Sequence, residues 1–187
     1  MNTPFQTVAL IGKYNSAELG EPLLRLAAFL RQRNLEVLLA QQTAERIGPV
    51  PYAAVSMAEI GARADLAVVL GGDGTMLNIA RELIEFDVPL VGVNQGRLGF
   101  LTDVSIEQML GTMEEILEGE YTAEERFLLH TAVRRQGQIV FQAYAFNDVA
   151  VSKGVSGRLI ELEVFIDGQF VYSQRSDGLV VATPTGS

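Results

Sequence analysis

The chain has 187 residues, 48% of them hydrophobic, so it can bury a core and hold one large or two small domains. Its 23 acidic and 14 basic side chains give a formal net charge of −9, which argues against nucleic acid or an anionic membrane as the main partner. The absence of cysteine excludes disulfides and thiol chemistry, and the single histidine, His130, excludes a histidine-rich metal site. We expect a soluble cytoplasmic protein, because no apolar run approaches the roughly 18 residues that span a bilayer and no leader-like segment opens the chain.

Segments typical of strands and helices alternate over residues 1–120. Short apolar runs predict strands at Thr7–Gly12, Leu35–Ala40, Leu66–Leu70 and Pro89–Val93. Apolar residues at helical spacing predict helices at Leu19–Arg33, at Val55–Ala64, from Met76 to Ile84, and from a capping box of Ser105 and Gln108 to Gly119. Strands that alternate with helices predict an α/β domain built on a doubly wound parallel sheet.

The pattern changes near residue 120, and residues 121–187 read as mainly β. Alternating or apolar runs predict strands at Ala132–Arg135, Ile139–Phe146, Ala150–Ser152, Leu159–Ile166 and Phe170–Gln174. Asp167-Gly168 predicts a two-residue hairpin turn. The sequence stops just after the predicted turn at residues 183–187, and the strands predicted before it are too few to close a sheet. We therefore expect the natural protein to continue and this β domain to be incomplete.

The segment Gly71–Thr75 joins a predicted buried strand to a predicted helix. Its three glycines allow close approach of a ligand, and the first turn of a helix offers N–H groups to an anion, which favours phosphate. Asp73 conflicts with phosphate unless it binds a metal ion, accepts a hydroxyl proton or points away. A purely structural alternative is that Asp73 or Thr75 caps the helix. The spacing matches neither the Walker loop nor the dinucleotide fingerprint.

Other polar segments are expected near the same edge of the sheet or within the β region. In parallel sheets, ligands lie beyond the carboxyl ends of the strands, where Gly12-Lys13-Tyr14 and Asn94–Phe100 also fall. Asn147-Asp148 and Arg175–Gly178 interrupt the β region. Each of these segments has a structural alternative as a plain loop, bulge or turn.

Taken together, these segments resemble one family, the bacterial-type NAD kinases. The matching motifs are Gly71–Thr75, Gly92–Leu101, Asn147-Asp148 and Arg175–Ser187, in the order and spacing of the family. The resemblance implies transfer of the γ-phosphoryl group of ATP, or of polyphosphate, to the 2′-hydroxyl of the adenosine ribose of NAD. It also implies Mg²⁺ or another divalent cation, a homodimer or homotetramer, and an active site between an α/β and a β-rich domain.

The resemblance further implies roles for particular residues. Asp73 would be the catalytic carboxylate, and no metal ligand is assigned. NAD contacts would come from Asp73, Gly74, Phe100, Asn147, Asp148 and Asp177. The phosphate-binding loop would comprise Gly71, Gly72, Gly74 and Thr75, with Asn94, Arg97, Arg175 and Thr185 as further candidates. The family more often has Asn-Glu where this chain has Asn147-Asp148, so the contact made by the shorter carboxylate differs.

Two other functions remain open from the residues alone. Diacylglycerol, sphingosine and sugar kinases share a Gly-Gly-Asp-Gly turn, so a lipid- or sugar-directed kinase is the first alternative. A non-catalytic nucleotide-binding module is the second.

Overall fold

The computed structural model describes residues 4–12, 20–96, 99–155 and 157–187. These fall into two compact units, unit 1 (Met1–Ala123) and unit 2 (Glu124–Ser187), which are described separately. Among the described residues, no helix is long and apolar enough to cross a membrane.

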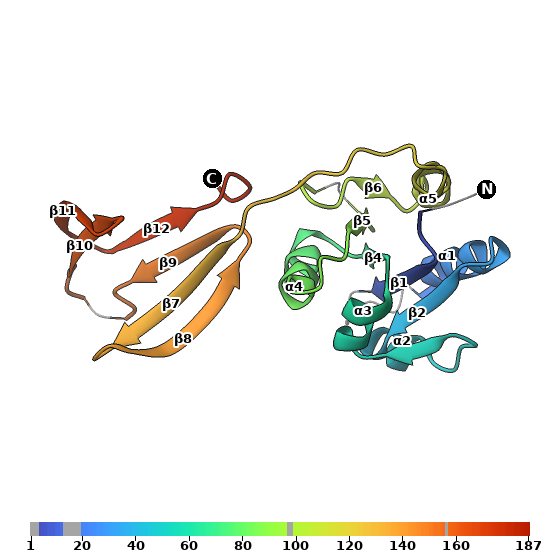
Figure 1. Ribbon diagram of the computed structural model, residues 1–187, viewed down its shortest axis with the longest axis horizontal. Coiled ribbons are helices and arrows are strands. Elements are labelled where there is room, and N and C mark those ends of the chain that lie inside the picture. Colours follow the sequence, from blue (N-terminus) through green and yellow to red (C-terminus); the bar gives the residue numbers. More distant parts are fainter. Residues whose placement is uncertain (1–3, 13–19, 97–98, 156) are drawn as a thin grey trace. The chain divides into compact units, whose positions relative to one another are not determined.

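Unit 1 is a six-stranded parallel sheet with helices on both faces (Figure 1). Its elements are β1 (Thr7–Gly12), α1 (Gly20–Gln32), β2 (Glu36–Ala40), α2 (Gln41–Ile47), β3 (Ala53–Val55), α3 (Met57–Arg63), β4 (Leu66–Leu70), α4 (Asp73–Leu83), β5 (Leu90–Asn94), β6 (Val104–Ser105) and α5 (Met109–Glu118). The strand order is β3-β2-β1-β4-β5-β6, so the direction of winding reverses between β1 and β4. The doubly wound α/β architecture expected from the sequence is confirmed.

The core lies on both faces of this sheet because successive side chains of a strand point to opposite faces. In β4, Leu66, Val68 and Leu70 pack with α1 and α5, whereas Ala67 and Val69 pack with Ile60 of α3 and Ile79 of α4. All five residues of β4 are buried. An uninterrupted apolar strand is therefore what this central position requires.

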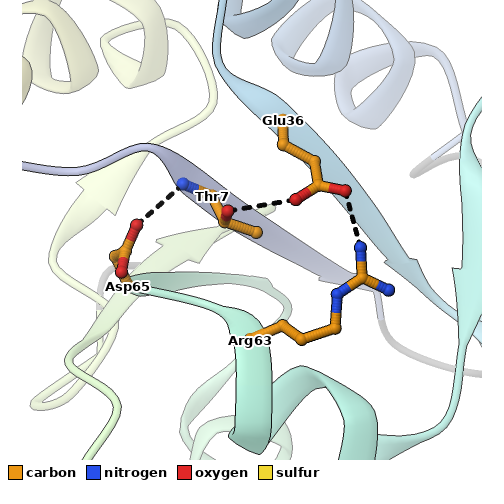
Figure 2. Close-up of polar contacts among 4 residues, drawn as sticks. All are labelled: Thr7, Glu36, Arg63 and Asp65. Carbon is orange, nitrogen blue, oxygen red and sulfur yellow. Dashed lines mark hydrogen bonds and ion pairs between the residues drawn. The ribbon is translucent and has the colours of Figure 1, made fainter.

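Hydrogen bonds also tie the amino-terminal ends of the strands together, as Figure 2 shows. Oδ2 of Asp65 accepts the backbone N–H groups of Gln6 and Thr7, each at 2.8 Å. The Thr7 hydroxyl donates to Glu36, and Glu36 forms an ion pair with Arg63 at 2.6 Å. These contacts fix β1, β2 and β4 in register at the edge opposite the Gly71–Thr75 turn.

Several short elements were missed or misplaced by the sequence analysis. The helix α2 and the strands β3 and β6 were not predicted, because they are too short for their periodicity to stand out. The predicted capping box at Ser105 is wrong: α5 begins at Met109, and Gln108 is its N-cap residue without a side-chain cap. The Ser105 hydroxyl accepts the N–H of Gln108 at 3.3 Å, but within the turn that leads from β6 into the helix.

Unit 2 consists of three antiparallel strand pairs, β7–β8, β9–β12 and β10–β11. Their bounds are β7 (Leu129–Arg135), β8 (Gln138–Ala145), β9 (Asp148–Ser152), β10 (Ile160–Ile166), β11 (Gln169–Ser176) and β12 (Gly178–Ala182). Asp167 and Gly168 both have positive φ angles, 51° and 77°, which confirms the predicted hairpin turn. His130 is an exposed residue of β7 whose ring lies beside that of Tyr144.

Large apolar side chains of unit 2 are exposed to an unusual degree. They include Val133, Phe141, Phe165, Phe170 and Val180, each at least 44% exposed. The described residues of unit 2 thus contribute little buried apolar area of their own, in contrast to unit 1.

Candidate functional site

The Gly71–Thr75 turn connects β4 to α4 at the carboxyl edge of the sheet. Gly72 is the N-cap residue of α4 and no side chain caps the helix, so the capping alternative for Asp73 and Thr75 is wrong. The Gly72 carbonyl oxygen accepts the N–H groups of Thr75 and Met76 at 2.9 and 3.1 Å. Within the described part of the chain, the N–H groups of Gly72, Asp73 and Gly74 have no acceptor, which leaves three donors open to an anion.

The Asp73 carboxylate lies against residues 100–102, which follow β5. Its Oδ2 accepts the backbone N–H of Phe100 at 2.9 Å. Its Oδ1 accepts the backbone N–H of Leu101 and the hydroxyl of Thr102, each at 3.0 Å. Three hydrogen-bond donors of the same unit thus compensate the negative charge of Asp73. This explains how a carboxylate can lie beside a turn that is suited to binding phosphate.

These contacts also set the pKa of Asp73. Partial burial raises it, but the hydrogen bonds from Phe100, Leu101 and Thr102 together outweigh burial, and the pKa lies below its ordinary value. The carboxylate is therefore ionised at neutral pH and is a weak base. That favours orientation of a hydroxyl group over early abstraction of its proton.

A second layer of hydrogen bonds supports this contact. Asn94, at the end of β5, donates from Nδ2 to the Thr102 hydroxyl at 3.0 Å. Its Oδ1 accepts the N–H of Gly96 at 2.9 Å. The candidate Asn94 is thus placed behind Asp73 rather than at the surface, with only 9% exposure. Thr102 was missed by the sequence analysis, because a single threonine after a glycine-rich loop forms no recognisable pattern.

The glycines around Asp73 differ in what a side chain would meet. A Cβ atom at Gly99 would lie 2.1 Å from Oδ1 of Asp73, and one at Gly92 would lie 2.4 Å from the carbonyl oxygen of Leu101. A Cβ atom at Gly72 or Gly74 would have no described atom within 4 Å. Gly92 and Gly99 are therefore needed for packing of the 99–102 segment, whereas open space adjoins Gly72 and Gly74.

Other candidates of unit 1 are less constrained. The Phe100 side chain is 92% exposed, although its backbone N–H is bound to Asp73. The Thr75 side chain packs against Gly71, where a Cβ atom would lie 2.7 Å from its hydroxyl oxygen. Arg97, Lys13 and Tyr14 lie outside the described residues.

Unit 2 brings Asn147 together with residues 183–186. The Asn147 carbonyl oxygen accepts the N–H of Thr183 at 2.7 Å, and a Cβ atom at Gly186 would lie 2.4 Å from that oxygen. The Thr183 hydroxyl donates to the carbonyl oxygen of Phe146 at 2.7 Å. Among the described residues, Oδ1 of Asn147 is buried without a hydrogen-bond donor, which leaves an acceptor suited to a ligand.

The remaining candidates of unit 2 lie on its surface. Asp148 begins β9, is exposed and pairs in register with Ala182. Asp177 forms an ion pair with Lys153 at 2.5 Å. Arg175 lies opposite Glu161 in the β10–β11 pair.

Thr185 is the last of the predicted candidates. Its hydroxyl accepts from Arg126 at 3.3 Å, so it takes part in the local structure of the 183–187 turn.

Comparisons with known proteins place the chain in a family. Residues 8–121 match the family described as "ATP-NAD kinase N-terminal domain", and residues 146–187 match "ATP-NAD kinase C-terminal domain". An NAD kinase of Aromatoleum aromaticum is 58% identical over 188 residues, covering 100% of this chain and 63% of that protein. An NAD kinase of Nitrosomonas eutropha is 54% identical, with 100% and 63% covered. The chain thus spans 63% of the length of each of these two relatives.

The chain is also similar to two solved structures. The crystal structure of yeast NADH kinase complexed with NADH has a TM-score of 0.87 and 26% identity, covering 100% of this chain and 59% of that one. A diacylglycerol kinase of Bacillus anthracis has a TM-score of 0.51 at 17% identity, covering 97% and 65%, which shows a shared fold alone. On its matched domains, its relatives and its fold, the chain belongs to the ATP-NAD kinase family.

Proposed function

We propose that the protein is an NAD kinase, which transfers the γ-phosphoryl group of ATP to the 2′-hydroxyl of the adenosine ribose of NAD to give NADP. The observation that carries the proposal is the position of Asp73. An ionised carboxylate lies at the start of α4, where Phe100, Leu101 and Thr102 donate hydrogen bonds to it. It adjoins a glycine turn whose N–H groups have no acceptor among the described residues. Membership of the ATP-NAD kinase family supports phosphoryl transfer as the reaction in which the carboxylate and the glycine turn take part.

In this proposal different residues of unit 1 bind the phosphates and align the acceptor hydroxyl. The N–H groups of Gly72, Asp73 and Gly74 bind phosphate oxygens, and the open space beside Gly72 and Gly74 admits the nucleotide. Asp73 accepts a hydrogen bond from the acceptor hydroxyl, aligns it with phosphorus and takes its proton late in the transfer. Phosphoryl transfer has a loose transition state, so alignment and charge compensation contribute more than a strong base would.

We further propose that NAD is contacted by Phe100, Asn147, Asp148 and Asp177, in addition to Asp73 and Gly74. Oδ1 of Asn147 is buried and receives no hydrogen bond from any described residue, which supports an adenosine contact because that part of NAD carries N–H and O–H donors. Asp148 and Asp177 offer exposed carboxylates to ligand hydroxyls or amides. In this proposal residues 1–120 form a nucleotide-binding α/β domain that carries the Gly71–Thr75 turn, and residues 121–187 form the first part of a β-rich NAD-binding domain.

A divalent cation, Mg²⁺ in the first instance, is proposed to enter with the nucleotide. No group of three or more His, Asp or Glu side chains that could hold a metal ion occurs among the described residues. Two of the three donors to Asp73 already occupy its Oδ1. The side chains thus fit a cation held chiefly by phosphate oxygens, where it would offset their charge.

NADH is a second candidate acceptor, because the yeast relative of similar fold is an NADH kinase in complex with NADH. Polyphosphate is a second candidate donor, on the family resemblance alone. A cytoplasmic location and a homodimer or homotetramer are proposed on the same basis.

A product assay on the protein in its full natural length tests the proposal. We expect NADP from NAD, ATP and Mg²⁺, with NADH and polyphosphate tested in parallel. Diacylglycerol and fructose 6-phosphate serve as control acceptors and should not be phosphorylated. Phosphorylation of either control in place of NAD would support the lipid- or sugar-directed alternative. Calorimetric binding of NAD without product under any donor would support a non-catalytic module.

A further inference from the structure

The hydrogen bonds behind Asp73 have a fixed direction, which follows from the donor and acceptor chemistry of each group. The Gly96 N–H can only donate, so Oδ1 of Asn94 is its acceptor and Nδ2 faces Thr102. Because Nδ2 also only donates, the Thr102 oxygen must accept from it. The single hydroxyl proton of Thr102 is then directed to Oδ1 of Asp73, 3.0 Å away.

This arrangement treats the two carboxylate oxygens of Asp73 differently. A carboxylate oxygen has about two lone-pair directions in which it accepts hydrogen bonds. Oδ1 receives both Leu101 N–H and Thr102 O–H, so it is saturated. Within the described ranges, the one hydrogen bond that Oδ2 accepts comes from the Phe100 N–H, which leaves one direction open.

We propose that Thr102, itself held by Asn94, is the positioning residue that fixes the Asp73 carboxylate and leaves Oδ2 as the atom that receives the acceptor hydroxyl. The role in catalysis rests on the proposed function, whereas the positioning of the carboxylate does not. Thr102 is fully buried, so a substrate cannot contact it, and it acts through Asp73. The same contacts fix the backbone of Phe100, whose side chain stands out into solvent.

The test compares Thr102→Val with Thr102→Ser in the protein of full natural length. Valine keeps the shape but removes the hydroxyl, and serine keeps the hydroxyl. Hydrogen bonds to a charged group contribute enough that we expect a roughly tenfold or larger fall in kcat for Thr102→Val. KM for NAD should stay within about twofold, and Thr102→Ser should recover most of kcat.

A matched control is Thr7→Val, since the Thr7 hydroxyl also donates to a carboxylate, that of Glu36, at the opposite edge of the same sheet. It should leave kcat unchanged. An equal fall in kcat in Thr7→Val, or no recovery in Thr102→Ser, would reduce the effect of Thr102→Val to general destabilisation and overturn the inference.

Amide hydrogen exchange measured by NMR separates failure of this inference from failure of the proposed function. In Thr102→Val the Phe100 and Leu101 amides should exchange at least about tenfold faster than in the parent. Unchanged exchange would overturn the positioning role whether or not the parent makes NADP. If the parent makes no NADP but the two amides still exchange faster in Thr102→Val, the kinase proposal is rejected. Thr102 is then still established as the residue that positions Asp73.

Discussion

The Thr102 hydroxyl lies 3.0 Å from Oδ1 of Asp73, although 29 positions separate the two residues in the sequence. Asp73 thus belongs both to the turn after β4 and, through its hydrogen bonds, to the segment after β5. Replacing it removes a proposed catalytic group and also a support for residues 100–102. Variants and their controls must separate these two effects.

The first prediction concerns Asp73→Asn. We expect turnover in a coupled NADP assay to fall at least about a hundredfold, because a neutral amide cannot take the proton of the acceptor hydroxyl. The amide nitrogen would also face a backbone donor at Phe100 or Leu101, which should lower the melting temperature somewhat.

Asp65→Asn is the matched control, because Asp65 also accepts two backbone N–H groups, but at the opposite edge of the sheet. It should lower stability by a similar amount and leave turnover unchanged. Near-normal turnover in Asp73→Asn would remove Asp73 from the chemistry.

The second prediction concerns the close approach of Gly99 to Asp73. In Gly99→Ala the new Cβ would lie 2.1 Å from Oδ1 of Asp73, so the carboxylate or the 99–102 segment must shift. Overpacking of this kind costs about 1–3 kcal/mol. We expect turnover to fall at least about tenfold, since alignment of the hydroxyl is lost.

Gly111→Ala in α5 is the control, since nothing lies within 4 Å of a Cβ atom there. It should keep full turnover and melt at the same or a slightly higher temperature. Full activity in Gly99→Ala would show that the position of the carboxylate is not critical.

The third prediction concerns pH. The pKa of folded Asp73 is below its ordinary value, so its ionised form stabilises the fold above the unfolded pKa of about 4. That contribution is lost as the pH falls through the folded pKa. The amide chemical shifts of Phe100 and Leu101 should therefore stay constant from pH 7 to about 5 and titrate only below about 4. A midpoint above pH 5 would contradict the hydrogen-bonding scheme.

The fourth prediction concerns unit 2. In Gly186→Ala the Cβ would lie 2.4 Å from the carbonyl oxygen of Asn147, a backbone atom that cannot rotate away. The displaced Asn147 should bind NAD about tenfold more weakly, as measured by calorimetric titration or KM. Gly157→Ala, with nothing within 4 Å of its Cβ, is the control and should bind NAD as the parent does. Equal NAD affinity in the two variants would exclude Asn147 from the NAD contacts.

The sequence by itself determined the architecture of unit 1 and most strands of unit 2. Buried parallel strands such as β4 are short apolar runs, so their composition predicts their burial. The helices α1 and α4 carry apolar stripes, so the spacing of apolar residues predicts which face is buried. Left-handed turns such as Asp167-Gly168 are equally local, because few residues adopt positive φ. The two-residue strand β6 and the seven-residue helix α2 were not predicted, because their neighbours in the fold hold them and their own sequences carry no clear pattern.

Only the tertiary structure decided what Asp73 contacts. The sequence identified Asp73, Asn94 and Phe100 as candidates but left the carboxylate facing a hydroxyl, a metal ion or its own helix. Its donors come from residues 27 to 29 positions away, brought close by the parallel pairing of β4 with β5. Thr102 entered the site only there, because a hydrogen bond across two strand ends depends on distance in space and leaves no periodic mark in the sequence.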